Sequence, residues 1–229
     1  EVPAWWILER SVERFPQRCA LRILDHETGV ELGALTYEAL WRSAGAVANG
    51  FRRRGVGPGD RIVLCLPNGP ELVTGFYAAW LLGATVVPVN PALTERELDG
   101  QAADADARLL VAASAGAPLA AGIAARLGIP LVVAGSPGDA IPPGALRFDE
   151  LLREDGQGVS PAAVDPAEDV AVLLYTGGTT GAPKGAMLTH RNLVANTIQF
   201  AEWYAFEPGA EVCVGALPMF HSGGMSGVV

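Results

Sequence analysis

Lysine is almost missing from this chain. Its 229 residues contain 16 lysines and arginines together, and Lys184 is the one lysine among them. Against 25 acidic residues, this leaves a formal net charge of −9. A nucleic-acid backbone requires a basic surface, so we expect no nucleic acid as a partner. The one strong basic run, Arg52-Arg53-Arg54, ends a predicted helix, where cations complement the helix dipole.

Cysteine and histidine are scarce as well. The three cysteines, Cys19, Cys65 and Cys213, form no CxxC pair, and each lies in an apolar, strand-like stretch. An odd number in a chain of this length argues against a disulfide framework. We therefore expect buried free thiols in a reducing compartment, the cytoplasm. The three histidines are too widely spaced to form a metal cluster.

Several targeting and catalytic signatures are absent. No signal peptide is visible at the N-terminus, no G-x-S-x-G supports a serine nucleophile, and no G-x-G-x-x-G opens a helix after a strand. Residues 72–94 carry no charge and are long enough to cross a bilayer. Gly83 and Pro88 interrupt this stretch, so it is predicted to form a helix, a turn and a strand instead.

Apolar residues, in contrast, make up half of the chain. Stretches of helical periodicity alternate with short apolar strands over the first 133 residues, which predicts parallel βαβ units and an α/β fold with buried strands. The expected helices are 4–15, 36–54 with Thr36 as its N-cap, 70–82, 94–105 and 117–127. The expected strands are 19–24, which begins a hairpin, and 61–66, 85–89, 108–111 and 131–133.

The rest of the chain divides into two parts. Residues 134–169 are rich in proline and glycine and predict a loose connection with one short helical turn at 148–153. Residues 170–229 then carry a strand at Val170–Leu174, a glycine-rich loop, a second strand around 186–188 and a helix at 191–203. A last strand is predicted at Val212–Leu217.

The glycine-rich loop is the strongest functional signal. The residues Tyr175-Thr176-Gly177-Gly178-Thr179-Thr180-Gly181-Ala182-Pro183-Lys184-Gly185 combine four glycines, three threonines and one cation. Exposed backbone amides, hydroxyls and a mobile point charge suit phosphate, although such loops also serve as plain linkers. Pro183 precedes the lysine and an apolar stretch follows it, so this is no Walker A loop. We expect a loop between two strands that binds phosphate through its backbone.

The three histidines have surroundings that indicate different roles. His221 follows a predicted strand and precedes glycines, a place where α/β proteins put ligand sites. Two interpretations of His221 are equally open. It contacts or gates the substrate, or it hydrogen-bonds its own loop. His190 belongs to the start of a helix capped by Thr189 and is assigned a structural role, and His26 lies in a predicted exposed turn.

The loop resembles the phosphate-loop signature of the adenylate-forming enzymes, which include acyl-CoA synthetases, nonribosomal adenylation domains and firefly luciferase. Further segments resemble landmarks of that family in the same order. They are Leu35–Leu40, Gly57–Ile62, Ala84–Pro91 and Leu217–His221. The likeness covers the whole chain, but only the N-terminal portion of such an enzyme.

The resemblance implies a reaction and a set of residues. A carboxylic acid and ATP give an acyl-adenylate and pyrophosphate, and a thiol, usually that of coenzyme A, then takes the acyl group. Mg²⁺ neutralises the phosphates, with Thr176 as a candidate hydroxyl on its side, and His221 lies by the acyl pocket. The phosphates would contact Thr176, Gly177, Gly178, Thr179, Thr180, Gly181 and Lys184.

Two departures qualify the resemblance. The family most often has serine where this chain has Gly177, which removes one hydroxyl. Its later motifs, including the adenine and ribose sites and the C-terminal catalytic lysine, are not in these 229 residues, so we expect an N-terminal portion that is inactive alone. The Pro-Met-Phe-His segment favours a free-standing CoA ligase. A peptide-synthetase adenylation domain and a non-catalytic nucleotide-binding fragment stay open.

Overall fold

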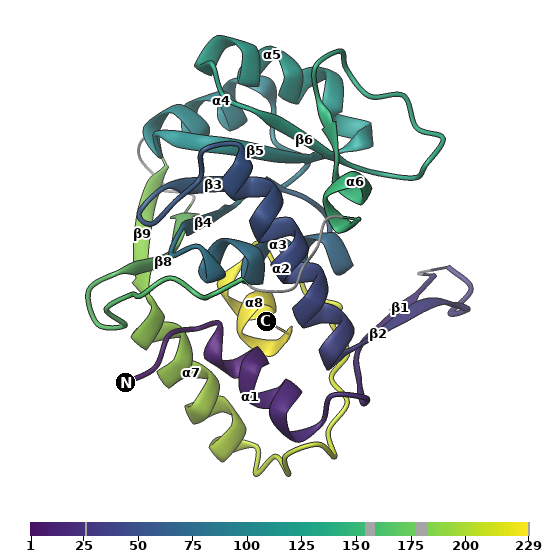
Figure 1. Cartoon of the computed structure of the whole chain (residues 1–229), viewed down its shortest axis with the longest axis vertical. Coiled ribbons are helices and arrows are strands. Elements are labelled where there is room, and N and C mark those ends of the chain that lie inside the picture. Colours follow the sequence, from purple (N-terminus) through teal and green to yellow (C-terminus); the bar gives the residue numbers. More distant parts are fainter. Residues whose placement is uncertain (26, 154–158, 177–182, 229) are drawn as a thin grey trace.

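A seven-stranded sheet forms the centre of the molecule (Figure 1). The computed structural model describes residues 1–25, 27–153, 159–176 and 183–228. The strand order is β7-β6-β5-β3-β4-β8-β9, and only β8 and β9 are antiparallel neighbours. The predicted α/β fold of mostly parallel βαβ units is therefore confirmed. The strands are β3 (Arg61–Cys65), β4 (Thr85–Pro88), β5 (Ala107–Ala113), β6 (Leu131–Ala134), β7 (Leu146–Arg147), β8 (Val170–Thr176) and β9 (Lys184–Thr189).

Helices cover both faces of this sheet (Figure 1). Alternate residues of a strand point to opposite faces, and β3 divides accordingly. Ile62 and Leu64 pack with helices α2 and α3, whereas Val63 and Cys65 pack with α4 and α5. Both faces are thus buried, as the continuous apolar strands predict. These helices are α2 (Tyr37–Arg53), α3 (Pro70–Leu81), α4 (Glu95–Asp104) and α5 (Ala117–Leu127).

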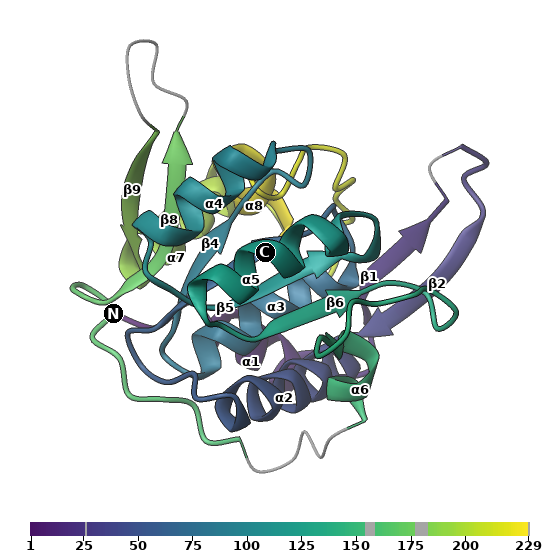
Figure 2. The same ribbon diagram turned by 90° about the horizontal axis from the view of Figure 1, so that it is seen from above.

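The remaining elements lie around this core. A hairpin of β1 and β2 stands on the side of the molecule opposite to the β8–β9 pair (Figure 2). The stretch predicted as a loose connection contains β7 and α6, and farther on the Ala162 N–H donates to the carbonyl of Leu81 at 2.8 Å. The elements are α1 (Trp6–Arg14), β1 (Cys19–Leu24), β2 (Glu31–Thr36), η1 (Ser114–Gly116), α6 (Phe148–Leu152), α7 (His190–Trp203) and α8 (Ser222–Val228).

The predicted helix caps are confirmed. The Thr36 hydroxyl accepts the Ala39 N–H at 3.1 Å and begins α2. Thr189 and Asn192 accept each other's backbone N–H groups at the start of α7. Each cap satisfies N–H groups that the first turn of a helix leaves unpaired.

The strand predicted at Val212–Leu217 is wrong. These residues belong to no strand, and the Val212 and Val214 side chains are 93% and 88% exposed. A short run of β-branched and other apolar residues favours extended backbone, but a ladder also needs a second strand, and none among the described residues pairs with this segment.

The expectation of three buried thiols is correct only for Cys65. All three cysteines are free, but Cys19 and Cys213 are exposed. Cys19 begins the β1–β2 hairpin, which has only two strands, and Cys213 lies in the segment that forms no strand. Exposure follows because neither stretch is packed between two layers of helices.

The long uncharged stretch from residue 72 divides as expected. It forms α3, a turn at Gly83 and then β4. Gly83 has a φ of +68°, and a Cβ there would lie 3.2 Å from that of Ala162, so the turn favours glycine. In the described part of the chain, no helix is long and apolar enough to cross a membrane.

Candidate functional site

The predicted phosphate loop connects the antiparallel strands β8 and β9, which confirms that it joins two strands. Thr176 ends β8, Lys184 begins β9, and the two residues are partners across the ladder. The Thr176 hydroxyl donates to the backbone carbonyl of Lys184 at 3.4 Å, and both residues are exposed. The other predicted phosphate contacts, Gly177, Gly178, Thr179, Thr180 and Gly181, lie outside the described residues, as does His26.

Two buried side chains fix the beginning of β8. The Trp80 indole N–H donates to the Ala171 carbonyl at 3.0 Å, and the Thr85 hydroxyl donates to the Val170 carbonyl at 2.7 Å. Since β8 runs parallel to β4, its carboxyl end lies at the same sheet edge as the ends of β3, β5 and β6. Ligands of open α/β sheets bind at this edge.

The strand ends next to the loop are closely packed. A Cβ on Gly185 would lie 2.7 Å from the end of the Leu173 side chain, so a larger residue after Lys184 would require that side chain to move. The Tyr175 hydroxyl donates to the Asp104 carboxylate at the end of α4. Burial and this hydrogen bond raise the pKa of Tyr175, which keeps the phenol protonated. The site therefore has a rigid base on the β8 side.

His221 lies in the turn that leads into α8. Its backbone N–H donates to the Pro218 carbonyl at 3.1 Å, and its ring centroid is 4.7 Å from that of Phe220. Within the described residues the imidazole makes no hydrogen bond or ion pair, and it is exposed. No such bond joins it to Thr176 or Lys184, but nearby Met219 packs in the same core cluster as β8. In the described part of the chain, the imidazole is therefore not hydrogen-bonded to its own loop.

His190 has the structural role that its sequence position predicts. It is buried, its Nδ1 accepts the Ala4 N–H at 3.1 Å, and its ring lies edge-on to that of Trp80. Burial lowers its pKa from 6.5 to about 4. A neutral imidazole thus joins the end of the β8–β9 pair to the N-terminal segment and to α3.

Asn68 was missed by reasoning from the sequence. It follows β3 in the turn Pro67-Asn68-Gly69, and such turns commonly contain asparagine for local reasons. In the structure its side chain binds the backbone of Gly215, Leu217 and Met219. No local pattern could reveal this contact.

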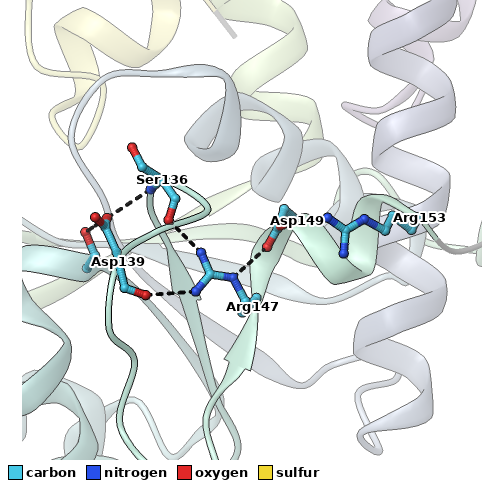
Figure 3. Close-up of polar contacts among 6 residues, drawn as sticks. Ser136, Asp139, Arg147, Asp149 and Arg153 are labelled. Carbon is cyan, nitrogen blue, oxygen red and sulfur yellow. Dashed lines mark hydrogen bonds and ion pairs between the residues drawn. The ribbon is translucent and has the colours of Figure 1, made fainter.

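A pocket of about 260 Å³ lies at the carboxyl ends of β3, β5 and β6. The loop that borders it is held by Asp139, which accepts the Ser114 hydroxyl at 2.7 Å and the Ser136 N–H at 2.9 Å. Arg147 donates to the carbonyls of Ser136 and Asp139 and pairs with Asp149 (Figure 3). The hydrogen bonds from the Ser114 hydroxyl and the Ser136 N–H, together with the nearby charge of Arg147, lower the pKa of the Asp139 carboxyl group.

The chemistry of this pocket does not suit a polyphosphate. Asp139 and Glu71 supply carboxylates to its wall, and among the described residues that line it there is no lysine or arginine. Like charges would repel a triphosphate. Its lining is Leu66, Pro67, Glu71, Ala113, Ser114, Ala134, Gly135, Ser136 and Asp139. The strand pair with Lys184 is the better anion site of the two.

Similarity to known proteins identifies the family of this chain. Residues 8–229 match the family of AMP-binding enzymes. The chain belongs to this family. It is 32% identical to a long-chain-fatty-acid–CoA ligase of Bacillus subtilis (strain 168) over 97% of the chain and 43% of that protein. It is 34% identical to 4-coumarate–CoA ligase 3 of Oryza sativa subsp. japonica, over 87% of the chain and 35% of the relative.

A solved structure with bound ATP has a similar fold. The ATP-bound MatB of Rhodopseudomonas palustris has a TM-score of 0.78 and 27% identity, over 98% of this chain and 42% of that one. The chain spans less than half of the length of these three relatives. It resembles a fatty-acid–CoA ligase and a 4-coumarate–CoA ligase over most of its own length.

Metal ligands are few among the residues of this AMP-binding chain that the structure describes. Within 1–25, 27–153, 159–176 and 183–228, no group of three or more histidine, cysteine or acidic side chains could hold an ion. Mg²⁺ bound to a nucleotide is coordinated mainly by phosphate oxygens and water, and it needs only one or two oxygen ligands from the protein. The exposed hydroxyl of Thr176 fits that limited demand.

Proposed function

We propose that the full-length protein is an ATP-dependent acyl-CoA synthetase of fatty-acid or aryl-acid type. A carboxylate oxygen attacks the α-phosphorus of ATP, the bond to the bridging oxygen breaks, and pyrophosphate leaves. The sulfur of coenzyme A then attacks the acyl carbonyl, and AMP leaves with the bonding electrons. The observation that carries the proposal is the exposed pair of Thr176 and Lys184 at the two ends of the loop between β8 and β9.

The residues have separate roles in this proposal. The loop residues Gly177 to Gly181 and the Thr176 hydroxyl bind the β- and γ-phosphates. Lys184 stabilises the negative charge that builds up on the leaving pyrophosphate. Thr176 also contacts the magnesium side of the phosphates, where the metal supplies charge neutralisation. His221 borders the acyl group.

The proposal includes an organisation and a setting. Residues 1–133 form a βαβ subdomain of the AMP-binding domain, 134–169 a connection and 170–229 the phosphate-loop segment, with the C-terminal domain outside these residues. The free thiols favour the cytoplasm, and the similarity to a long-chain-fatty-acid–CoA ligase favours a place in fatty-acid metabolism. The net charge of −9 disfavours nucleic acid.

The first test follows pyrophosphate release by the full-length protein with a panel of fatty, aryl and amino acids. Release that depends on both ATP and one class of acid is expected, and the absence of release with every acid would refute the proposal. Release with amino acids instead would favour a peptide-synthetase adenylation domain. The same panel identifies the acid.

The second test isolates Lys184. Lys184→Ala should lower ATP–pyrophosphate exchange by about tenfold to hundredfold, because one charge-stabilising donor is lost. Lys184→Arg should retain part of the activity, since the charge remains but its geometry changes. Arg22→Ala is the control, because it removes another exposed cation from a strand, in the hairpin on the opposite side of the molecule. Exchange that is equal in Lys184→Ala and wild type would refute the role of this lysine.

A further inference from the structure

Asn68 binds a segment that lies about 150 residues farther along the chain. Its amide nitrogen donates to the carbonyl oxygens of Gly215 at 3.0 Å and Leu217 at 2.8 Å. Its amide oxygen accepts the N–H of Met219 at 2.8 Å. Both hydrogens of the side-chain amide and one oxygen lone pair are therefore used.

This pattern selects asparagine by its chemistry. The two carbonyl oxygens need donors on one side of the side chain, and the Met219 N–H needs an acceptor on the other. A rotated amide would place its oxygen against two carbonyls. Aspartate has the same size but no N–H donor, so it could satisfy only the Met219 group.

The segment that Asn68 holds has a second restraint. Residues 215–219 belong to no strand, so no ladder fixes them. A Cβ on Gly224 would lie 2.2 Å from the Pro218 carbonyl oxygen, which shows that α8 packs directly on this backbone. The Met219 side chain is buried in the core. Asn68 holds the segment from the turn after β3, and Gly224 allows the start of α8 to lie close to the backbone of the same segment.

We propose that Asn68 is a positioning residue for His221. Met219 precedes His221 by two residues, and the His221 N–H donates to Pro218 within the held turn. The hydrogen bonds of Asn68 thus set the location of an imidazole that itself makes no bond among the described residues. A preset side chain orients a substrate without an ordering cost at the time of binding. The role of His221 at the acyl group rests on the proposed function.

Amide hydrogen exchange tests the hydrogen bonds without any activity. In Asn68→Ala the Met219 N–H loses its acceptor, and its exchange should accelerate about fivefold or more, the equivalent of one net hydrogen bond. Asn196→Ala, on the exposed face of α7, is the matched control and should leave that rate unchanged. Unchanged exchange of Met219 in Asn68→Ala would overturn the proposal.

Steady-state kinetics of the full-length protein test the positioning. Asn68→Ala and Asn68→Asp should each lower kcat/KM for the acid about tenfold, with KM for ATP within about threefold of wild type. Gly224→Ala should lower the same constant. Wild-type kinetics in Asn68→Asp would show that only the volume of the side chain matters, and equal losses for acid and ATP would show a general structural defect. Either result overturns the proposal.

The two proposals fail in different ways. If the wild-type protein forms no adenylate with any acid, the proposed function fails, and the exchange rate of Met219 still decides whether Asn68 fixes the segment. If the wild type is active and the Asn68 variants match it, only the positioning role fails. Thermal unfolding of each variant beside wild type identifies any that does not fold, and Asn68→Asp, which keeps the volume, then carries the test.

Discussion

Protonation of His190 should destabilise the folded chain. The side chain is 1% exposed, accepts the Ala4 N–H at Nδ1 and lies against Trp80 with ring centroids 6.4 Å apart. Burial lowers its pKa from 6.5 to about 4, and the Asp169 carboxylate opposes only part of that shift. A proton on Nδ1 would also remove the acceptor that Ala4 requires.

The sign and size of the effect follow from the two pKa values. The unfolded chain binds this proton below about pH 6.5, and the folded chain binds it only below about pH 4. The contribution to stability is therefore intact above pH 6.5 and is lost as the pH falls from about 6.5 to about 4. The difference corresponds to about 3 kcal/mol, of which about 2 kcal/mol is lost between pH 7 and pH 5.

Urea unfolding of wild type and His190→Asn at pH 7, 6 and 5 measures this. Asparagine keeps an acceptor for Ala4 but does not titrate, and its poorer contact with Trp80 should cost about 1–2 kcal/mol at every pH. Between pH 7 and pH 5, the free energy of unfolding of wild type should fall by about 2 kcal/mol more than that of the variant. The carboxylates titrate in both proteins, so their contribution cancels in the comparison. Parallel pH curves for the two proteins would refute the reasoning.

The α2 cap, the buried thiol and the strand before the phosphate loop provide three further tests. Thr36→Ala should lower the free energy of unfolding by about 1 kcal/mol in urea, and Thr36→Ser should restore most of it. Burial raises the pKa of Cys65 to about 11, so iodoacetamide at pH 8 should modify Cys19 and Cys213 well before Cys65, and equal rates by mass spectrometry would contradict this. Tyr175→Phe loses the bond to Asp104 and should raise KM for ATP in the full-length protein about twofold to fivefold, with KM for the acid unchanged. An equal rise in both constants would instead indicate a general loss of structure.

The order of the elements could be predicted because local patterns encode it. The strand at Arg61–Cys65 is apolar on both faces, which is the pattern of a strand buried between two layers of helices. Thr36 and Thr189 each accept the backbone N–H of the residue three positions farther on. Both caps are therefore local and can be recognised in the sequence. Whether an extended segment becomes a strand also depends on a partner strand, so the local pattern at Val212–Leu217 was insufficient to predict its structure.

The candidate site was also predictable only in part. The loop from Thr176 to Lys184 is a continuous stretch, so its composition alone indicated phosphate chemistry and its flanking apolar runs indicated two strands. The tight packing at Gly185 was not predictable, because the side chain closest to a Cβ there, that of Leu173, comes from the partner strand.

The sequence by itself determined the α/β class, the family resemblance and the place of the phosphate loop, since each depends on neighbouring residues. The tertiary structure decided which distant groups fix the strand that precedes this loop and the turn of His221. Trp80 reaches β8 across 91 residues, and Asn68 reaches Leu217 across 149. Such hydrogen bonds depend on how the helices and strands pack, and the residues at either end give no local sign of the partner that folding brings to them.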